Sequence, residues 1–219
     1  MENSDQLPVS NTNKPLLVIG PGGHARVVID AALESGFTLR GIIDPAFSGE
    51  EEQILGIPVL GNAELLNDFD PELFDIAIAI GSNQKREIWI QRVTSLGYNL
   101  PPIVHPTAIV SKHVNIGAGV FINAGVIINA MAKIGVGSII NTGATIDHDT
   151  SIGRAVHVGP GCRISGRVKV GAGTFIGTGS SIIDYINIGD EVMIGAGSVI
   201  IKDIESHATV VGVPGRKIK

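Results

Sequence analysis

An aliphatic residue recurs at every sixth position through the C-terminal half of this chain. From Val104 to Ile200, 17 consecutive positions spaced by six are each Val or Ile. Neither the 3.6-residue period of an α-helix nor the two-residue period of a strand produces a strict six. Glycine also recurs every eighteen residues, at Gly117, Gly135, Gly153, Gly171 and Gly189. Together the two periods predict a coiled repeat with three six-residue steps in each coil.

Each step is predicted to be a short strand followed by a turn. The Val or Ile would point to the axis, where stacked β-branched side chains fill a narrow core. Three residues later the sequence often has glycine, as at Gly119 and Gly143, because a sharp corner needs φ > 0. The prediction is a parallel β-helix of about five coils that rises roughly 4.8 Å per coil. Spacing alone does not decide its hand, and the general crossover rule favours right-handed connections.

The tandem Ile-Gly-x-x-x-x units resemble those of the hexapeptide-repeat acyltransferases. In that family the parallel β-helix is left-handed. The resemblance therefore implies a left-handed coil for this chain.

Composition narrows the class of protein. A length of 219 residues, a mean hydropathy of +0.32 and a net charge of −5 favour a soluble globular protein of one or two domains. The acidic excess gives no support for nucleic acid or an anionic membrane as partner. The single Cys162 excludes an internal disulfide, fits a reducing cytosol and falls at a predicted core position. With no long apolar run and no leader-like segment, we expect a cytoplasmic protein.

The N-terminal half has a different pattern. Buried strands alternate with helices, which predicts a small parallel sheet of Rossmann-like style. We expect strands at 16–19, 39–43, 57–60 and 74–80, and helical segments at 25–35, 62–67 and 83–96. Pro101 and Pro102 mark a boundary. The predicted domains are a disordered N-terminus (1–13), the Rossmann-like domain (14–100), the β-helix (103–205) and a C-terminal tail (206–219).

A glycine-rich turn follows the first strand. The segment Gly20-Pro21-Gly22-Gly23-His24 would present free backbone N–H groups at a helix N-terminus, which suits a phosphate. Asp44 ends the second strand, where a ribose-binding carboxylate lies in dinucleotide folds. The alternative is that the glycines serve only a tight turn and that His24 is a solvated residue at a helix end.

These motifs and the repeat together resemble one subfamily. Gly-x-Gly-Gly-His-Ala-Arg-Val-Val, then Ile-Asp-Pro, then Ala-Ile-Gly-Ser-Asn and the hexapeptides look like the bacterial nucleotide-sugar N-acetyltransferases. These enzymes act on 4-amino-4,6-dideoxy sugars for surface glycan synthesis, and the related sialic acid O-acetyltransferases share the layout. The resemblance implies that the N-terminal domain holds the nucleotide sugar. The implied pocket consists of Gly22, Gly23, His24, Asp44, Gly81, Ser82 and Asn83.

Reactive side chains are expected on the outside of the coil. His148 and Asp149 occupy a corner where other coils mostly have a small residue and glycine. A histidine beside a carboxylate suits a general base, because the acid can fix the tautomer and raise the basicity. The alternative is a solvated corner. The family motif, in which His precedes an acidic residue after an Ile/Val-x pair, favours catalysis.

His157 belongs to an outer stripe with an eighteen-residue period. That stripe, Phe121, Ile139, His157, Phe175 and Met193, is mostly apolar, whereas the stripe containing Lys133 and Lys169 is polar. An apolar face favours association, and a three-sided prism suits a cyclic homotrimer. His148 and His157 are nine residues apart and so lie on opposite sides of one prism. We therefore expect three composite sites at subunit interfaces.

The same spacing predicts where acetyl-CoA binds. Pro160, Thr178 and Ala196 stack beside the His157 face, and His148, Gly166, Asp184 and Lys202 stack on the opposing corner. A pantetheine arm would lie along this seam with its thioester near His148. The resemblance implies cofactor contacts at His157, Gly166, Thr178 and Ala196.

The expected chemistry is direct transfer of an acetyl group to a sugar amine, with His148 as base and no covalent enzyme intermediate, because no Ser or Cys lies beside a base. O-acetylation of a sialic-acid-like sugar is the nearest alternative. A zinc-dependent carbonic anhydrase would need a third histidine in the middle coils, so no metal is expected. A non-catalytic sugar-binding protein would leave the His148-Asp149 pair without a purpose.

Overall fold

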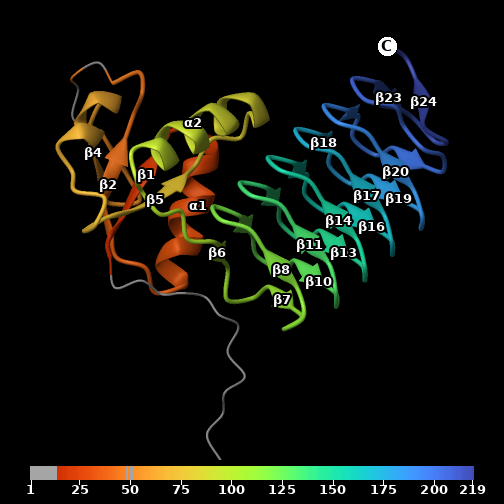
Figure 1. The fold of residues 1–219 in the computed structure, drawn as a ribbon, viewed down its shortest axis with the longest axis horizontal. Coiled ribbons are helices and arrows are strands. Elements are labelled where there is room, and N and C mark those ends of the chain that lie inside the picture. The colour runs from red at the N-terminus through yellow and green to blue at the C-terminus, as the bar shows by residue number, and fades with distance from the viewer. Residues whose placement is uncertain (1–13, 48, 50–51) are drawn as a thin grey trace, which may run out of the picture.

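The structure, a computed structural model, describes residues 14–47, 49 and 52–219. An α/β domain is followed by a long stack of coils, with the C-terminus at the far end of the stack (Figure 1). The predicted fold class, a Rossmann-like domain followed by a left-handed β-helix, is confirmed. The segment 1–13, expected to be disordered, lies outside the described residues.

The N-terminal domain is a five-stranded sheet in the order β3-β4-β2-β1-β5. Its strands are parallel except for β3, which pairs antiparallel with β4. The bounds are β1 (Leu16–Ile19), β2 (Leu39–Ile43), β3 (Gln53–Ile54), β4 (Ile57–Gly61) and β5 (Asp75–Ile78), with α1 (Gly23–Glu34), the 3-10 helix η1 (Ala63–Asn67) and α2 (Asn83–Ser95).

The sheet is covered on both faces, as the continuous apolar strands require. Leu16 and Val18 of β1 pack in one cluster with α1, whereas Leu17 and Ile19 pack in a second cluster with η1 and α2. Strand alternation thus sends successive residues of β1 to opposite layers. The carboxyl ends of β1, β2 and β5 share one edge, which places the glycine-rich turn, Asp44 and residues 79–83 together.

The β-helix is built from two-residue strands, and each of the 17 predicted Val or Ile positions ends one of them. The first sheet contains β6 (Ile103–Val104), β9 (Phe121–Ile122), β12 (Ile139–Ile140), β15 (His157–Val158), β18 (Phe175–Ile176), β21 (Met193–Ile194), β23 (Thr209–Val211) and β24 (Arg216–Lys217). The second contains β7 (Ile109–Val110), β10 (Ile127–Ile128), β13 (Thr145–Ile146), β16 (Arg163–Ile164), β19 (Ser181–Ile182) and β22 (Val199–Ile200). The third contains β8 (Asn115–Ile116), β11 (Lys133–Ile134), β14 (Ser151–Ile152), β17 (Lys169–Val170) and β20 (Asn187–Ile188).

Neighbouring strands in each sheet are eighteen residues apart and in register, as in the pairing of Ile128 with Ile146. The aliphatic positions and the small or β-branched residues two places before them form one continuous core along the axis. Cys162 belongs to it and is 0% exposed, as predicted. The segment 206–219 adds β23 and the antiparallel β24 to the end of the first sheet.

The outer stripe of Phe121, Ile139 and His157 does not lie open along its length. Phe121 and Ile139 are 4% and 1% exposed because the N-terminal domain of the same chain covers them, in one cluster with α1. Ser35 at the end of α1 also donates a hydrogen bond of 2.8 Å to the carbonyl of Val104. Only the later part of the stripe is open, with Met193 47% exposed. The apolar stripe therefore serves first as the contact between domains.

Two glycine positions in the coil have different physical causes. A Cβ on Gly135 would lie 2.6 Å from the carbonyl carbon of Gly153, because successive coils approach most closely there. Gly143 has open space around it, but its φ of +65° lies in the left-handed region that L-residues rarely adopt. The eighteen-residue glycine period therefore reflects contact between backbones, whereas corner glycines reflect backbone conformation.

This distinction predicts different costs for the same substitution. Gly143→Ala should cost about 1 kcal/mol, the penalty for one left-handed residue. Gly135→Ala should cost more than about 2 kcal/mol, because backbone atoms of the next coil must move. Thermal unfolding of the two variants against the wild type measures the difference. A Gly143→Ala protein that melts below Gly135→Ala would contradict the explanation for the period.

Candidate functional site

The corner after β13 holds His148 and Asp149 in a defined arrangement. His148 Nδ1 lies 2.8 Å from Asp149 Oδ2. A carboxylate only accepts hydrogen bonds, so Nδ1 carries the proton and Nε2 is left as the basic nitrogen. Asp149 has φ = 58°, a conformation that turns the chain sharply at this corner. The two residues are about half exposed, and the sequence correctly paired them.

Asp147 has a separate role at the same corner. Its Oδ1 accepts hydrogen bonds from Asn129 Nδ2 at 2.8 Å and from the backbone N–H of His148 at 2.7 Å. These bonds hold the pKa of the Asp147 carboxyl below its usual value. Asp147 therefore fixes the backbone of the corner, whereas Asp149 orients the imidazole.

The next coil supplies the floor beneath His148. A Cβ on Gly166 would lie 2.8 Å from His148 Nε2, so the imidazole packs directly over this glycine. Backbone hydrogen bonds from Arg167 to His148 and from Tyr185 to Gly166 join the successive coils at this corner. Only a residue without a side chain fits under the ring in this position.

The sequence analysis did not identify Arg167 and Tyr185, which stack with Asp149 at this corner. Arg167 Nε lies 3.8 Å from Asp149 Oδ2, and Arg167 donates a 2.6 Å hydrogen bond to the Tyr185 hydroxyl. The three residues are spaced by eighteen and all have positive φ. The same periodicity that predicted the fold would have placed them together.

His157 lies on a different sheet and faces the N-terminal domain. Its Nδ1 is 3.4 Å from the carbonyl oxygen of Gly81, and its Nε2 is 3.3 Å from Asn141 Nδ2. Its ring packs edge-on against Phe175, with centroids 5.1 Å apart. His157 is thus placed beside the turn 81–83, which the sequence assigned to a different ligand.

His24 lies close to His157 at the start of α1. The two ring centroids are 6.2 Å apart, and His24 also packs edge-on against Phe121 at 5.4 Å. Burial, followed by the charge of neighbouring groups, lowers the pKa of each histidine to about 4. Both rings are therefore neutral at pH 7. His24 Nε2 is buried with no hydrogen-bond partner within the described residues, a state that a bound polar group would relieve.

The glycine-rich turn leaves space in front of α1. A Cβ on Gly22, Gly23 or Gly81 would meet nothing within 4 Å. Sterics within the chain therefore do not explain these glycines, and close approach of a ligand to the backbone would. Asp44 lies at the same sheet edge, where its Oδ1 accepts a 2.8 Å hydrogen bond from the N–H of Ala46.

The seam predicted for acetyl-CoA has the expected order of residues. The N–H of Gly179 bonds to the carbonyl of Pro160, and the N–H of Gly197 bonds to that of Thr178, so these corner residues stack with Ala196. His148 bonds to Asp147 and Asp149 at its own corner, whereas His157 contacts both Asn141 of the β-helix and Gly81 of the N-terminal domain. One chain thus brings together the implied sugar pocket and His157, with His148 on a separate side of the coil.

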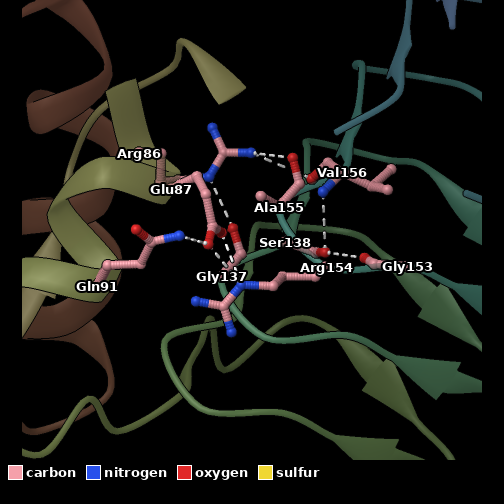
Figure 2. Close-up of polar contacts among 9 residues, drawn as sticks. All are labelled: Arg86, Glu87, Gln91, Gly137, Ser138, Gly153, Arg154, Ala155 and Val156. Carbon is pink, nitrogen blue, oxygen red and sulfur yellow. Dashed lines mark hydrogen bonds and ion pairs between the residues drawn. The ribbon is translucent and has the colours of Figure 1, made fainter. Parts of the chain in front are cut away.

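A cavity of about 990 Å³ opens between the N-terminus of α2 and the later coils. Its lining includes Gly81 and Ser82 on one side and Phe175 and Met193 on the other. The Glu87–Arg154 ion pair, at 2.7 Å, lies at its edge and joins the two domains (Figure 2). Burial raises the pKa of Glu87, but hydrogen bonds from Arg154 and Gln91 outweigh this and hold the pKa below its usual value.

The structure also bears on metal binding and on membrane insertion. Among residues 14–47, 49 and 52–219, no group of three or more His, Cys, Asp or Glu side chains is placed to hold a metal ion. Within the same described residues, no helix has the length and apolar character needed to cross a bilayer.

Known proteins resemble the chain over most of its length. The PglD N-terminal domain family matches residues 15–93. A mutant of perosamine N-acetyltransferase from Caulobacter crescentus, solved in complex with CoA and GDP-perosamine, is 35% identical with a TM-score of 0.90. That match covers 95% of this chain and 98% of the other. No curated protein sequence matches the chain.

Two further structures agree with this match. The acetyltransferase domain of PglB from Neisseria gonorrhoeae FA1090, in complex with acetyl coenzyme A, is 37% identical with a TM-score of 0.89. The match covers 94% of this chain and 100% of that domain. WeeI from Acinetobacter baumannii AYE has the same fold, with 24% identity, a TM-score of 0.86 and coverage of 94% and 100%.

The buried histidine pair predicts a loss of stability in acid. Both native pKa values, about 4, lie below the ordinary histidine pKa of 6.5, so the unfolded chain binds more protons between these limits. The free energy of unfolding should therefore fall as the pH drops from 6.5 to 4, by about 1 kcal/mol per pH unit for each histidine. Thermal melts of the wild type and of His24→Asn across this range measure the slope. An unchanged slope in the variant would contradict the role of His24.

Proposed function

Because this chain belongs to the hexapeptide-repeat acetyltransferases of nucleotide-linked amino sugars, with a PglD-type N-terminal domain, we propose that it acetylates the 4-amino group of a nucleotide-linked 4-amino-4,6-dideoxy sugar. The protein is an acetyltransferase, and acetyl-CoA is the donor. The observation that carries the proposed mechanism is the His148–Asp149 pair, with its basic Nε2 exposed over Gly166. The product would enter the synthesis of a surface glycan.

The proposed reaction is a single displacement at the thioester. The sugar amine attacks the acetyl carbonyl, and His148 Nε2 takes the proton from the amine as the C–N bond forms. The C–S bond then breaks and CoA leaves as the thiolate, which takes the proton from the His148 imidazolium and becomes the thiol. Asp149 stabilises the imidazolium formed on His148 at their 2.8 Å contact. Backbone N–H groups, assisted by His157, would stabilise the oxyanion.

A covalent enzyme intermediate does not fit the described residues. Cys162 is fully buried in the coil core, and burial raises the pKa of its thiol. The reactive form of a cysteine is the thiolate, which this environment disfavours. Direct attack by the amine therefore remains the simplest route for the acetyl group.

The nucleotide sugar is proposed to bind at the edge of the N-terminal sheet. Its phosphates would lie against the backbone of Gly22 and Gly23, at the N-terminus of the twelve-residue helix α1. Asp44 would contact the ribose, and His24 would give its unpartnered Nε2 to the ligand. Residues 81–83 would contact the sugar. The open space in front of the glycines supports this placement.

Acetyl-CoA is proposed to lie along the outside of the coil with its thioester near His148. Contacts are assigned to His157, Gly166, Thr178 and Ala196. Thr178 and Ala196 stack at one corner and Gly166 lies on the corner of His148, so the pantetheine arm would run between these two stacked corners. Because His148 and His157 face different sides of one chain, a complete site needs a second chain. We propose a homotrimer with three sites between subunits.

The acceptor and the base are tested together by release of free CoA. Acetyl-CoA is offered with a panel of nucleotide-linked 4-amino-4,6-dideoxy sugars and with sialic acid. We expect turnover with an amino sugar and a loss of about 100-fold or more in His148→Ala, within the range for a general base. His113→Ala, at an exposed histidine of an early coil, is the matched control and should keep the wild-type rate.

The other outcomes have clear meanings. Turnover with the hydroxyl acceptor alone would replace the proposal by O-acetylation. A full rate in His148→Ala would remove the assignment of the base. An absence of turnover with every acceptor would favour a binding protein.

The composite site predicts rescue between two inactive variants. His148→Ala and His157→Ala subunits, coexpressed in equal amounts, should assemble about a quarter of their interfaces with both histidines present. We expect activity near that fraction of the wild-type rate, while each variant alone stays low. Mass measured by light scattering should correspond to three chains. Mixed trimers no more active than the separate variants would show that each site lies within one chain.

A further inference from the structure

Helix α2 lies along one corner of the β-helix, and this contact is more regular than the rest of the domain interface. The corner consists of Gly119, Gly137, Ala155 and Gly173, which are eighteen residues apart and all have positive φ. Leu100 packs at Gly119, and a Cβ on Gly137 would overlap the side chain of Ile90. Figure 1 shows α2 beside the first coils.

Arg86 is the centre of this contact. It is only 1% exposed, and its guanidinium crosses from α2 to two successive coils (Figure 2). Nε donates to the carbonyl of Gly137 at 2.7 Å, and Nη2 donates to those of Ala155 at 2.8 Å and Val156 at 3.3 Å. The two coils are thus held at the same corner by one side chain.

The same guanidinium also holds the turn at the end of β5. Nη1 donates to the carbonyls of Ile80 at 3.0 Å and Gly81 at 3.1 Å, and Nη2 donates to Asn83 Oδ1 at 2.8 Å. Each of the three nitrogens therefore bonds to oxygen, and the acceptors are carbonyl and amide oxygens. Burial lowers the pKa of Arg86 to about 10, so it stays charged at pH 7. Glu87, its neighbour, bonds instead to Arg154.

Asn83 extends the contact to a third coil. Its Nδ2 donates to the carbonyls of Gly173 at 2.9 Å and Thr174 at 3.1 Å. Asn83, Arg86 and Ile90 therefore meet successive coils in order. Three or four helical residues rise about 4.5–6 Å, which matches the roughly 4.8 Å between coils. The spacing of these side chains along α2 therefore matches the rise of the coil. The helix cannot slide along the coil without breaking several hydrogen bonds at once.

The hydrogen bonds of Arg86, which we call the Arg86 clamp, join two segments of the proposed site. On one side it holds Gly81 and Asn83, in the turn assigned to the sugar. On the other it holds Ala155 and Val156, which immediately precede His157. We propose that Arg86 is a positioning residue for acetyl transfer: it sets the turn 81–83 at a fixed height along the coil relative to His157. This inference rests on the proposed function and adds a residue that touches neither substrate.

Lysine at position 86 provides the sharpest test. Arg86→Lys keeps the charge but replaces a planar fork with a single donor atom, so the carbonyls of separate segments are no longer held together. Because a displacement of about 1 Å can slow an enzyme about 100-fold, we expect kcat to fall at least tenfold. The KM for acetyl-CoA should change less than about threefold, since three of its four assigned contacts, Gly166, Thr178 and Ala196, are untouched.

Ser35→Ala is the matched control. It removes another hydrogen bond between the domains, from Ser35 to Val104, at a site that contacts neither the turn 81–83 nor the strand of His157. Its kcat should stay within about twofold of the wild-type value. Ile90→Ala is the second test variant, because it weakens the register of α2 without removing Arg86. It should lower kcat in the same direction, and it serves if Arg86→Lys does not fold.

Hydrogen exchange provides a measurement independent of turnover. Amides of residues 80–86 and 154–158 should exchange faster in Arg86→Lys than in the wild type or Ser35→Ala. Wild-type kcat in Arg86→Lys, or an equal loss in Ser35→Ala, would overturn the positioning role. If the wild type acetylates no amino sugar, the proposed function fails. The exchange pattern alone then tests whether Arg86 holds the two segments together. Unchanged exchange in both segments would then overturn the Arg86 clamp.

Discussion

The close spacing of successive coils is the constraint on which the rest of this structure depends. A Cβ at Gly135 would come within 2.6 Å of the next coil's backbone, so there is no room for a side chain at such points. Small or β-branched residues two places before each periodic Val or Ile fill the interior of the coil. Because every coil then rises by the same amount, residues eighteen apart are stacked on all outer surfaces.

Stacking of the coils determines the geometry of the corner that contains His148. His148 rests over Gly166, and Asp149 shares its column with Arg167 and Tyr185. The contact with Asp149 sets the tautomer of His148, while Gly166 of the next coil packs under its ring. The rigid, repeated backbone makes such positions precise without a surrounding globular core. The proposed catalytic function would therefore depend on two adjacent residues of an otherwise structural repeat.

The N-terminal domain depends on the same regularity through a polar contact. Arg86 uses carbonyl groups that every coil presents at its corner, so the domain is held at one height along the stack. The same interface covers Phe121 and Ile139 and places the neutral His24 and His157 side by side. Burial of these rings disfavours their charged forms, which links the docking of the domain to pH.

The sequence by itself determined the coil, its inward residues, the α/β domain and the His148–Asp149 pair, because each depends on local or strictly periodic positions. It assigned the apolar stripe to association between subunits, but Phe121 and Ile139 are covered by the chain's own domain. It also gave no sign of Arg86, whose partners in the β-helix are backbone carbonyls 51 to 70 residues away. Every residue offers a carbonyl, so sequence carries no mark of which ones an arginine will bind. Only tertiary structure, by docking α2 at the pitch of the coil, decided that choice and brought His24 to His157.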